Sequence, residues 1–262
     1  MLHEIAAETI YESTRDRTVA TDLVTVGVSL YNYARFLPEC LGSVAAQRHE
    51  ALELVIVDDL STKDDSVAVA RDWLQAHEAR FARVCLLRHH RNQGLAQARN
   101  TAFAHARARH VFVLDADNEL YPRAIGRLHQ AILTSAAAAA YTQQELFGAV
   151  SKIGLADIWH PEWLRHGNYV DAMALVSHDA WRDVGGYSHI EGGWEDYDFW
   201  CKFIEQGYTA VFVPEVLCRY RVHERSMIRT ETARSYDAIF VEMTLRHPWM
   251  RLAPIPPEDR AD

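Results

Sequence analysis

The chain has 262 residues, of which 49% are hydrophobic and 24% are charged, so it can bury a substantial core as an ordinary globular protein. Its net charge of −9 disfavours nucleic acid as a partner, because contacts to phosphates need a basic surface. The four cysteines show no C-x-x-C spacing, which argues against a zinc knuckle or a redox pair and favours a reducing cytoplasm.

Residues 1–22 contain no basic start followed by an apolar core, so we expect a polar extension and no secretory signal. The longest weakly polar run, residues 131–141, is too short and too rich in alanine to span a bilayer, and we expect no transmembrane segment. The segment 247–257, "HPWMRLAPIPP", has two interpretations: a loose tail, or a peripheral contact with a partner or with the inner face of a membrane.

Residues 23–142 alternate short β-rich runs with helical patterns. This alternation predicts βαβ units, so we expect an α/β fold with a Rossmann-like, doubly wound, mostly parallel sheet. The expected strands are 23–30, 52–59, 83–89, 110–117 and 136–143, and the expected helices are 35–48, 64–78, 94–108 and 122–134.

The pattern changes after residue 142. Residues 143–170 are irregular and rich in Trp, His and Gly, which suits a loop that faces a substrate better than a core segment. Gly207 is the expected C-terminal cap of a helix. The elements expected in this part are strands at 169–177 and 209–214 and helices at 178–186, 195–207 and 231–246.

Polar residues follow three of the expected strands at their carboxyl ends. They are Ser29, Asp58 with Asp59, and Asp115 with Asp117. Ligands of doubly wound sheets bind beyond these ends, so we expect the five residues to share one rim. No G-x-G-x-x-G follows the first strand and no G-K-[ST] occurs in the chain, so neither a dinucleotide motif nor a P-loop accounts for the rim.

The stretch "VFVLDADN" at 111–118 ends an apolar strand with two carboxylates. Side chains alternate along a strand, so Asp115 and Asp117 emerge on the same side. Two such charges repel each other unless a cation or a donor lies between them. The motif is weak by itself, because Asp196-Tyr197-Asp198 is a second Asp-x-Asp, and its meaning depends on the motifs around it.

Four stretches in this order, followed by "YRVHERSM", resemble the family 2 glycosyltransferases, which are nucleotide-sugar-dependent enzymes of the GT-A fold. The resemblance covers residues 23–229 and implies that fold here. It also implies that residues 23–142 bind the nucleotide sugar and that 143–229 form the acceptor-binding and catalytic half of the same domain, followed by a helix and tail at 230–262. The stretches are "VTVGVSLYNYARFLPECLGSVAAQ", "LELVIVDDLST", "NQGLAQARNTA" with "HVFVLDADN", and "GGYSHIEGGWEDYDFWCKFIEQGY".

The resemblance implies that Ser29, Tyr31 and Asn32 line the pocket for the base and ribose of the donor. It implies that Asp59 accepts a hydrogen bond from the base; the alternative for Asp58 and Asp59 is a turn that caps the next helix. The chain has Leu60 where the family usually has the glycine of VDDGST.

Arg99 would flank the nucleotide as a charge partner of the aspartate pair, and the alternative is a solvated arginine on a surface helix. The strand that ends in Asp-x-Asp has a further alternative, the nucleophile motif of haloacid-dehalogenase-type phosphatases. That motif usually carries Thr or Val two residues after its second aspartate, where this chain has Glu119.

The resemblance makes Asp117 a ligand of Mn²⁺ or Mg²⁺ that bridges the donor diphosphate, with Asp115 in contact with the ribose or, through water, with the metal. Such ions prefer oxygen ligands. His223 would complete the metal shell or touch the diphosphate, although a lone histidine is usually a surface or core residue. Arg219, Arg221 and Arg225 are nearby candidates for the cations that an anionic donor needs.

By resemblance, Asp196 is the base that removes the proton from the attacking hydroxyl, while Glu195 and Asp198 orient it or bind acceptor hydroxyls. The alternative is that acids in a first helical turn only stabilise the helix dipole. We expect an inverting, metal-dependent transfer of a single sugar from a nucleoside-diphosphate sugar, with UDP favoured, to a glycan or glycolipid-precursor acceptor. The processive Q-x-x-R-W motif is absent. Two other functions stay open, a sugar-phosphate nucleotidyltransferase and a catalytically silent binding domain.

Overall fold

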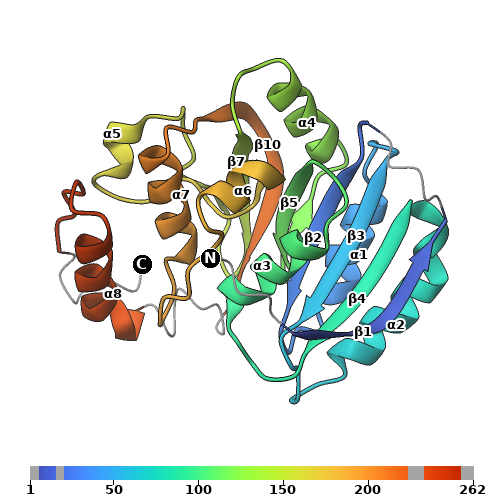
Figure 1. Ribbon diagram of the computed structural model, residues 1–262. Coiled ribbons are helices and arrows are strands. Elements are labelled where there is room, and N and C mark those ends of the chain that lie inside the picture. Colours follow the sequence, from blue (N-terminus) through green and yellow to red (C-terminus); the bar gives the residue numbers. More distant parts are fainter. Residues whose placement is uncertain (1–5, 16–20, 224–232, 255–262) are drawn as a thin grey trace.

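The computed structural model describes residues 6–15, 21–223 and 233–254 of the chain. Its strands are joined in one sheet with the order β1-β4-β3-β2-β5-β9-β7-β10-β6, and β8 pairs with β7 (Figure 1). The strands are β1 (Ala7–Thr14), β2 (Val24–Leu30), β3 (Leu52–Asp58), β4 (Arg83–His89), β5 (His110–Asp115), β6 (Glu119–Leu120), β7 (Ala139–Gly148), β8 (Lys152–Ile153), β9 (Ala174–Ser177) and β10 (Ala210–Val222). The α-helices are α1 (Leu37–Ala45), α2 (Ser66–His77), α3 (Leu95–His105), α4 (Ala124–Leu133), α5 (Pro161–Leu164), α6 (His178–Asp183), α7 (Glu195–Glu205) and α8 (Ala233–Arg246).

The centre of the sheet is parallel, which confirms the predicted α/β fold. Strands β4, β3, β2 and β5 run in one direction, and β7 and β10 are parallel to each other. The short strand β9 lies antiparallel between β5 and β7. Every residue of β2 and β3 is buried, as expected for strands that are covered on both faces.

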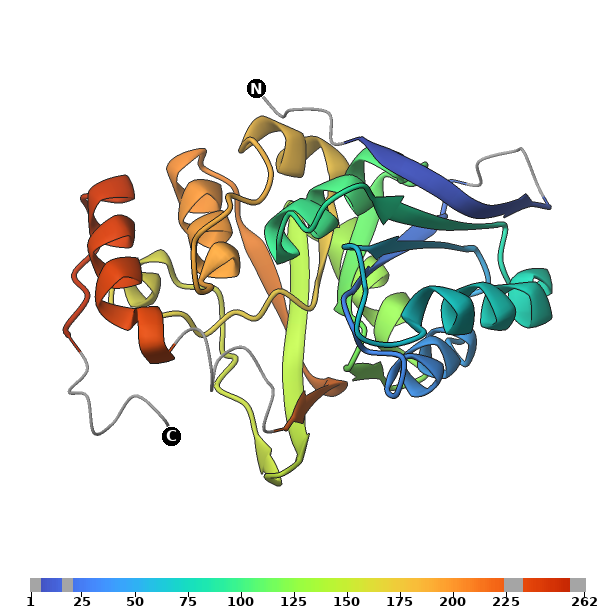
Figure 2. The same ribbon diagram turned by 90° about the horizontal axis from the view of Figure 1, so that it is seen from below.

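Helices cover both faces of the sheet: α1 and α2 lie on one side and α3 on the other (Figure 2). Alternate residues of β3 pack into the two layers, with Leu54 and Ile56 in the core under α1 and α2, and Val55 in the core under α3. Helix α3 lies very close to β2, because a Cβ atom at Gly27 would come within 2.9 Å of the Ala102 side chain. This close packing fixes the position of α3, which carries Arg99.

The predicted polar extension at residues 1–22 contains a strand that the sequence pattern did not indicate. Strand β1 pairs antiparallel with β4 and covers that edge of the sheet. Glu12 forms an ion pair with Arg83 at 2.7 Å, and the Tyr11 hydroxyl donates to Glu78. Edge strands are polar on their outer face, so this segment lacks the apolar run that marked the central strands.

Strand β10 is longer than the sequence pattern indicated. We predicted that it ends at Pro214, but it continues to Val222 alongside β7. Shifts in register between Val213 and Cys218 accommodate the proline, which has no N–H for a regular ladder. The continuation matters for the site, because it brings His223 next to the end of β5.

A second hydrophobic core lies between strands β5, β7 and β9 of the sheet and helices α6, α7 and α8. The predicted C-terminal helix is confirmed, with described residues from 233 to 246. The cap at Gly207 is also confirmed, because its φ is +75° and the N–H groups of Gly207 and Tyr208 bond the last turn of α7. The segment after α8 packs against α7 up to residue 252, with Met250 buried, so this part is not a loose tail; residues 255–262 lie outside the described structure.

Candidate active site

The carboxyl ends of β2, β3 and β5 form the rim that the sequence predicted. Ser29 and Asp115 are paired in register on neighbouring strands, and Asp58 ends the strand on the other side of β2. The Ser29 Oγ atom is buried and has no hydrogen-bond partner among the residues that the structure describes. A buried hydroxyl without a partner is costly, so this atom is a candidate contact for a ligand.

Arg99 lies at the centre of the site. It is 3% exposed and extends from α3 to two carboxylates that are far apart in the sequence. One terminal nitrogen lies 3.0 Å from Asp115 Oδ2, and the other lies 2.7 Å from Glu195 Oε1. The alternative of a solvated surface arginine is therefore wrong. Arg99 joins the rim of the sheet to the first turn of α7.

The carboxyl groups around Arg99 are crowded. Burial, with a smaller contribution from Asp117, raises the pKa of Asp115 to about 6 although Arg99 opposes the shift. Burial and the neighbouring acids Glu195 and Asp171 raise the pKa of Asp196 to about 7. Groups with such pKa values exchange protons near neutral pH, as a general base must.

Asp117 and His223 meet at the rim although 106 positions separate them. The His223 Nε2 atom lies 3.1 Å from Asp117 Oδ2. The turn is held from β10, because the Arg221 guanidinium donates to the Asp117 carbonyl and the Arg221 N–H donates to the Asn118 side chain. The structure thus brings together two of the three residues predicted at the metal, and the third, Asp115, is paired with Arg99.

The nearby arginines are not free cations. Arg219 forms ion pairs with Glu119 and Glu145, and Arg221 forms ion pairs with Glu39 and Glu119. Both arginines are therefore already paired with carboxylates, and their predicted role near an anionic donor stays a prediction. Arg225 lies outside the described residues.

Asp59 is already bonded within the protein. Its Oδ1 lies 2.6 Å from His89 Nδ1 and accepts the Gln93 N–H, and its Oδ2 accepts the Gly94 N–H at 2.8 Å. The side chain is 4% exposed. The geometry therefore supports a role in holding the turn before α3 and does not support the predicted hydrogen bond to the base. Asp58 is buried and accepts the Ser61 N–H, as in a capping turn.

Tyr31 and Asn32 are the two remaining residues predicted to contact the donor, and Tyr31 is the exposed one of the two. Its side chain is 40% exposed at the rim. Asn32 accepts from the N–H groups of Thr62 and Lys63, so it ties the β2 loop to the β3 loop. Its place in the donor pocket stays a prediction.

Three residues other than glycine have a left-handed backbone in the described structure, and all three are in loops at the site. They are Asn32, Leu60 and Trp194, with φ values of 56°, 62° and 66°. Leu60 occupies the position where the family usually has glycine, and the positive φ explains that preference. Strain of this kind concentrates at functional sites.

Asp196 lies in the first turn of α7, two residues after Trp194. Its Oδ1 accepts the Tyr197 N–H and its Oδ2 accepts the side-chain amide of Asn168 at 3.0 Å. Glu195 is buried and bonded to Arg99, so it orients the turn and does not reach an acceptor. Of the three acids predicted here, Asp196 is the one placed to act as a base.

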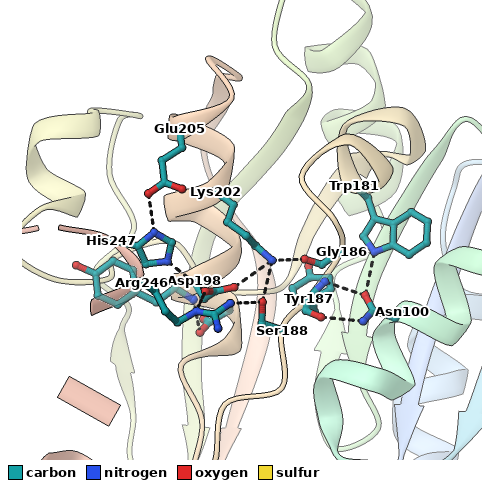
Figure 3. A network of polar contacts seen from close by, with 12 residues as sticks. Asn100, Trp181, Gly186, Tyr187, Ser188, Asp198, Lys202, Glu205, Arg246 and His247 are labelled. Carbon is teal, nitrogen blue, oxygen red and sulfur yellow. Dashed lines mark hydrogen bonds and ion pairs between the residues drawn. The ribbon is translucent and has the colours of Figure 1, made fainter. Parts of the chain in front are cut away.

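Asp198 is buried between α7 and the end of α8, next to Lys202, Arg246 and His247 (Figure 3). Its carboxylate contacts Arg246 at 2.6 Å, Lys202 at 3.1 Å and His247 at 3.1 Å. Burial alone would raise its pKa, but these cationic partners hold the pKa of Asp198 well below its usual range. The prediction that Asp198 binds the acceptor is wrong; the residue anchors α8.

The comparisons with known proteins agree with this geometry. The sequence profile of Glycosyl transferase family 2 matches residues 25–186, more than half of the chain. The chain belongs to this family. It is a glycosyltransferase that takes sugar from a nucleotide sugar, which excludes the nucleotidyltransferase alternative.

Relatives and solved structures of this glycosyltransferase are similar over most of its length. It is 25% identical over 236 residues to the glycosyltransferase named EpsE of Bacillus subtilis (strain 168), covering 85% of this chain and 82% of that one. It is 27% identical over 211 residues to TuaG of the same organism, named a teichuronic acid biosynthesis glycosyltransferase, covering 78% of this chain and 81% of that one.

Among solved structures, the mannosyltransferase PcManGT from Pyrobaculum calidifontis, in complex with GDP-Man and Mn²⁺, matches with a TM-score of 0.64 and 25% identity, covering 89% of this chain and 66% of that chain. TarS residues 1–349 of S. aureus, in complex with UDP-GlcNAc, match with a TM-score of 0.66 and 15% identity, covering 91% and 69%. Both likenesses support the GT-A fold of the glycosyltransferase.

The donor atoms at the rim of the glycosyltransferase fit a divalent cation. Asp117 supplies a carboxylate and His223 an imidazole nitrogen, and they already lie 3.1 Å apart. Within the described parts of the chain, no group of three or more Asp, Glu, His or Cys residues could enclose an ion. An Mg²⁺ or Mn²⁺ ion bound through few protein groups takes its remaining ligands from phosphate oxygens and water.

Two residues of the site escaped the sequence analysis. Asn168 bonds Asp196, and Asp171 is a half-buried carboxyl group near Arg99 and Glu195 that accepts the Met173 N–H. Asn168 lies in the irregular segment before β9, and Asp171 lies in the part of the predicted strand 169–177 that is not strand in the structure, since β9 begins at Ala174. Only the tendency of substrate-facing loops to carry function pointed to this segment.

No helix in the described ranges is both long enough and apolar enough to cross a membrane.

We expect Asp198→Asn to destabilise the glycosyltransferase by about 1.5–3 kcal/mol at pH 7, because each lost bond joins charged groups. Arg246 can turn to solvent, which limits the loss. The folded-state pKa of Asp198 is depressed, so its stabilisation is present above the unfolded value and disappears as the pH falls through the folded value. Denaturant unfolding from pH 7 to pH 3 checks both points.

The control is Asp183→Asn. Asp183 is an exposed acid bonded to Tyr208, and this variant should change the free energy of unfolding by less than about 0.5 kcal/mol.

Proposed function

We propose that this glycosyltransferase transfers a single sugar from a nucleoside-diphosphate sugar to an acceptor hydroxyl with inversion at the anomeric carbon. The observation that carries the proposal is the arrangement around Arg99, which joins the Asp115 end of the donor rim to the first turn of α7. Asp196 follows Glu195 in that turn and has a pKa of about 7. A base and a donor rim are thus held together by one buried cation.

The donor nucleoside lies along the ends of β2 and β3, where Tyr31 offers an exposed ring and Ser29 a buried hydroxyl without a partner among the described residues. Asp117 and His223 would hold Mn²⁺ or Mg²⁺. Bound there, the cation neutralises charge on the departing diphosphate. The GDP-Man and Mn²⁺ of PcManGT and the UDP-GlcNAc of TarS support a nucleotide-sugar donor, and we favour UDP.

Asp196 accepts the proton of the acceptor hydroxyl while the oxygen forms its bond to the anomeric carbon. The bond from that carbon to the diphosphate oxygen breaks in the same displacement, so the configuration inverts. The transition state has oxocarbenium character, as in other glycosyl transfers. Arg99 bonds Glu195, so that the turn presents Asp196 to the acceptor.

The acceptor approaches over the loop before β9, which borders Asp196 through Asn168. Helix α5, which precedes this loop, carries Trp163, which is 45% exposed, and aromatic faces pack well against the C–H surfaces of sugars. A glycan or glycolipid precursor is the proposed acceptor, and the name of TuaG, a teichuronic acid biosynthesis protein, supports this class. A glycolipid acceptor would bring the enzyme to the inner face of the membrane.

The first test measures the melting temperature with UDP, GDP or dTDP, each with and without Mn²⁺. A diphosphate at about 100 times its dissociation constant should add about 2.7 kcal/mol to the free energy of unfolding. We expect one diphosphate to stabilise the wild type only with Mn²⁺, and Asp117→Asn to abolish that effect. The control is Asp72→Asn, an exposed acid on α2, which should keep the full shift.

The absence of any shift would contradict the proposed donor site. A shift of equal size without Mn²⁺ would contradict the metal role of Asp117 and His223. After the donor is known, release of the diphosphate during turnover distinguishes an active enzyme from a catalytically silent binding domain.

A further inference from the structure

The loop before β9 bonds the side chain that we assign as the base. The Asn168 Nδ2 atom donates to Asp196 Oδ2 at 3.0 Å, and the Asn168 Oδ1 atom accepts the Val170 N–H at 3.1 Å. The second bond fixes the orientation of the amide, so its nitrogen faces the carboxylate. The contact therefore joins the loop to the first turn of α7 in a defined geometry.

We propose that Asn168 is a positioning residue for the catalytic base, because its amide holds the Asp196 carboxylate in place and favours its ionised form. This inference rests on the proposed function of Asp196. An amide N–H next to an oxygen stabilises a carboxylate and has no donor to offer in exchange once that oxygen is protonated.

The surroundings of Asp196 explain why such a donor is needed. The groups that act on it electrostatically come from five parts of the fold: Glu195 on α7, Asp171 before β9, Arg99 on α3, Tyr187 after α6 and Tyr220 on β10. Two of them are acids that oppose ionisation of Asp196, and Arg99 is bonded to Asp115 and Glu195. Within the described structure, Asn168 is the side chain that bonds the Asp196 carboxylate directly.

The bonds also leave room for an acceptor. Among the described residues, each carboxylate oxygen of Asp196 accepts one hydrogen bond, Oδ1 from the Tyr197 N–H and Oδ2 from Asn168. A carboxylate offers about four acceptor positions, so one of the remaining positions can receive the proton of a substrate hydroxyl. Asn168 is exposed, so its replacement should not disturb the core.

The direct experiment is a titration by NMR of protein labelled with ¹³C at aspartate carboxyl groups, with the signal of Asp196 assigned by its absence in Asp196→Asn. We expect Asn168→Ala to raise the titration midpoint of Asp196 by about one pH unit, the value of a lost bond to a charged group. Asn168→Asp adds a third neighbouring acid and should raise it further. The matched control is Gln130→Ala, an exposed amide on α4, which should leave the midpoint unchanged.

Activity gives a second readout. It uses a sugar ester of the nucleoside diphosphate found by melting, at saturating Mn²⁺, with water as the acceptor. The Asn168→Ala variant should lose about tenfold in kcat at pH 6 and almost nothing at pH 9, with an unchanged KM for the donor. An unchanged midpoint, or a loss of kcat that is equal at all pH values, would overturn the inference.

The two hypotheses fail in different ways. If Asp196→Asn keeps the kcat of the wild type, Asp196 is not the base and the proposed mechanism fails. If Asp196→Asn is inactive but Asn168→Ala leaves the Asp196 midpoint in place, only the role of Asn168 is wrong.

Discussion

Replacing Arg99 by methionine should lower the free energy of unfolding by about 3–5 kcal/mol at pH 7 and abolish turnover. Methionine fills much of the volume but leaves Asp115 and Glu195 without their shared cation in a buried setting, and removing one partner of a buried ion pair has an effect of this size. Turnover should stop because the first turn of α7 loses its link to the donor rim. Denaturant unfolding and a diphosphate-release assay measure the two effects.

The loss of stability should shrink as the pH falls. In the wild type the pKa of Asp115 is about 6, raised above its value of 3.8 in the unfolded chain. The folded state thus binds protons more readily than the unfolded state between these values, and it gains stability as the pH falls. Without Arg99 this pKa rises further, so the variant should recover most between pH 8 and pH 5.

Arg83→Met is the control for Arg99→Met. Arg83 is also buried and pairs with Glu12 and Glu53 at the far edge of the sheet. The Arg83→Met variant should lose a comparable amount of unfolding free energy but keep its turnover per folded molecule. If Arg99→Met stays active, or if both variants lose turnover equally, Arg99 has no special role in the site.

Replacing Asp196 by asparagine should lower kcat by about 10²–10⁴-fold, the usual contribution of a general base. Asparagine keeps the shape and can still bond its neighbours, but it cannot take the proton of a hydroxyl. The KM for the donor should change little, because in the described part of the chain the turn of Asp196 is joined to the donor rim through Glu195 and Arg99. Steady-state kinetics at pH 8 provides the measurement.

Asp179→Asn separates catalysis from the helix dipole. Asp179 also lies in a first helical turn, that of α6, and is exposed. If acids in first turns act only through the dipole, both variants should lose a few tenths of a kcal/mol in stability and neither should lose kcat. If Asp196→Asn keeps the kcat of the wild type, Asp196 is not the base that takes the proton of the acceptor hydroxyl.

The sequence predicted the parallel strands and the rim because both depend on local patterns. Buried parallel strands are continuous apolar runs, and their polar ends at Ser29, Asp58 and Asp115 follow directly in the chain. The approach of His223 to Asp117 was predicted by resemblance to a family. No spacing in the sequence indicated it, because the contact depends on the length of β10.

The roles of the three acids in α7 and of Asn168 could not be predicted from the sequence, because they depend on packing. Three acids occupy the first turn of α7, and their types do not show which one faces the rim. Asp198 is bound by Arg246 at the end of α8 and by the following His247, and Glu195 is bound by Arg99, which leaves Asp196. Asn168 lies in a loop without periodicity, so only its contact with Asp196 identifies it.

Strand β1 has a consequence for the solubility of the protein. It hydrogen-bonds along the whole of β4, which otherwise would present a row of unpaired N–H and C=O groups at the edge of an apolar sheet. Such an edge recruits strands from other molecules. A version shortened to begin at residue 21 would keep every residue of the site and yet be prone to associate edge to edge, so the polar N-terminal segment protects the protein from aggregation.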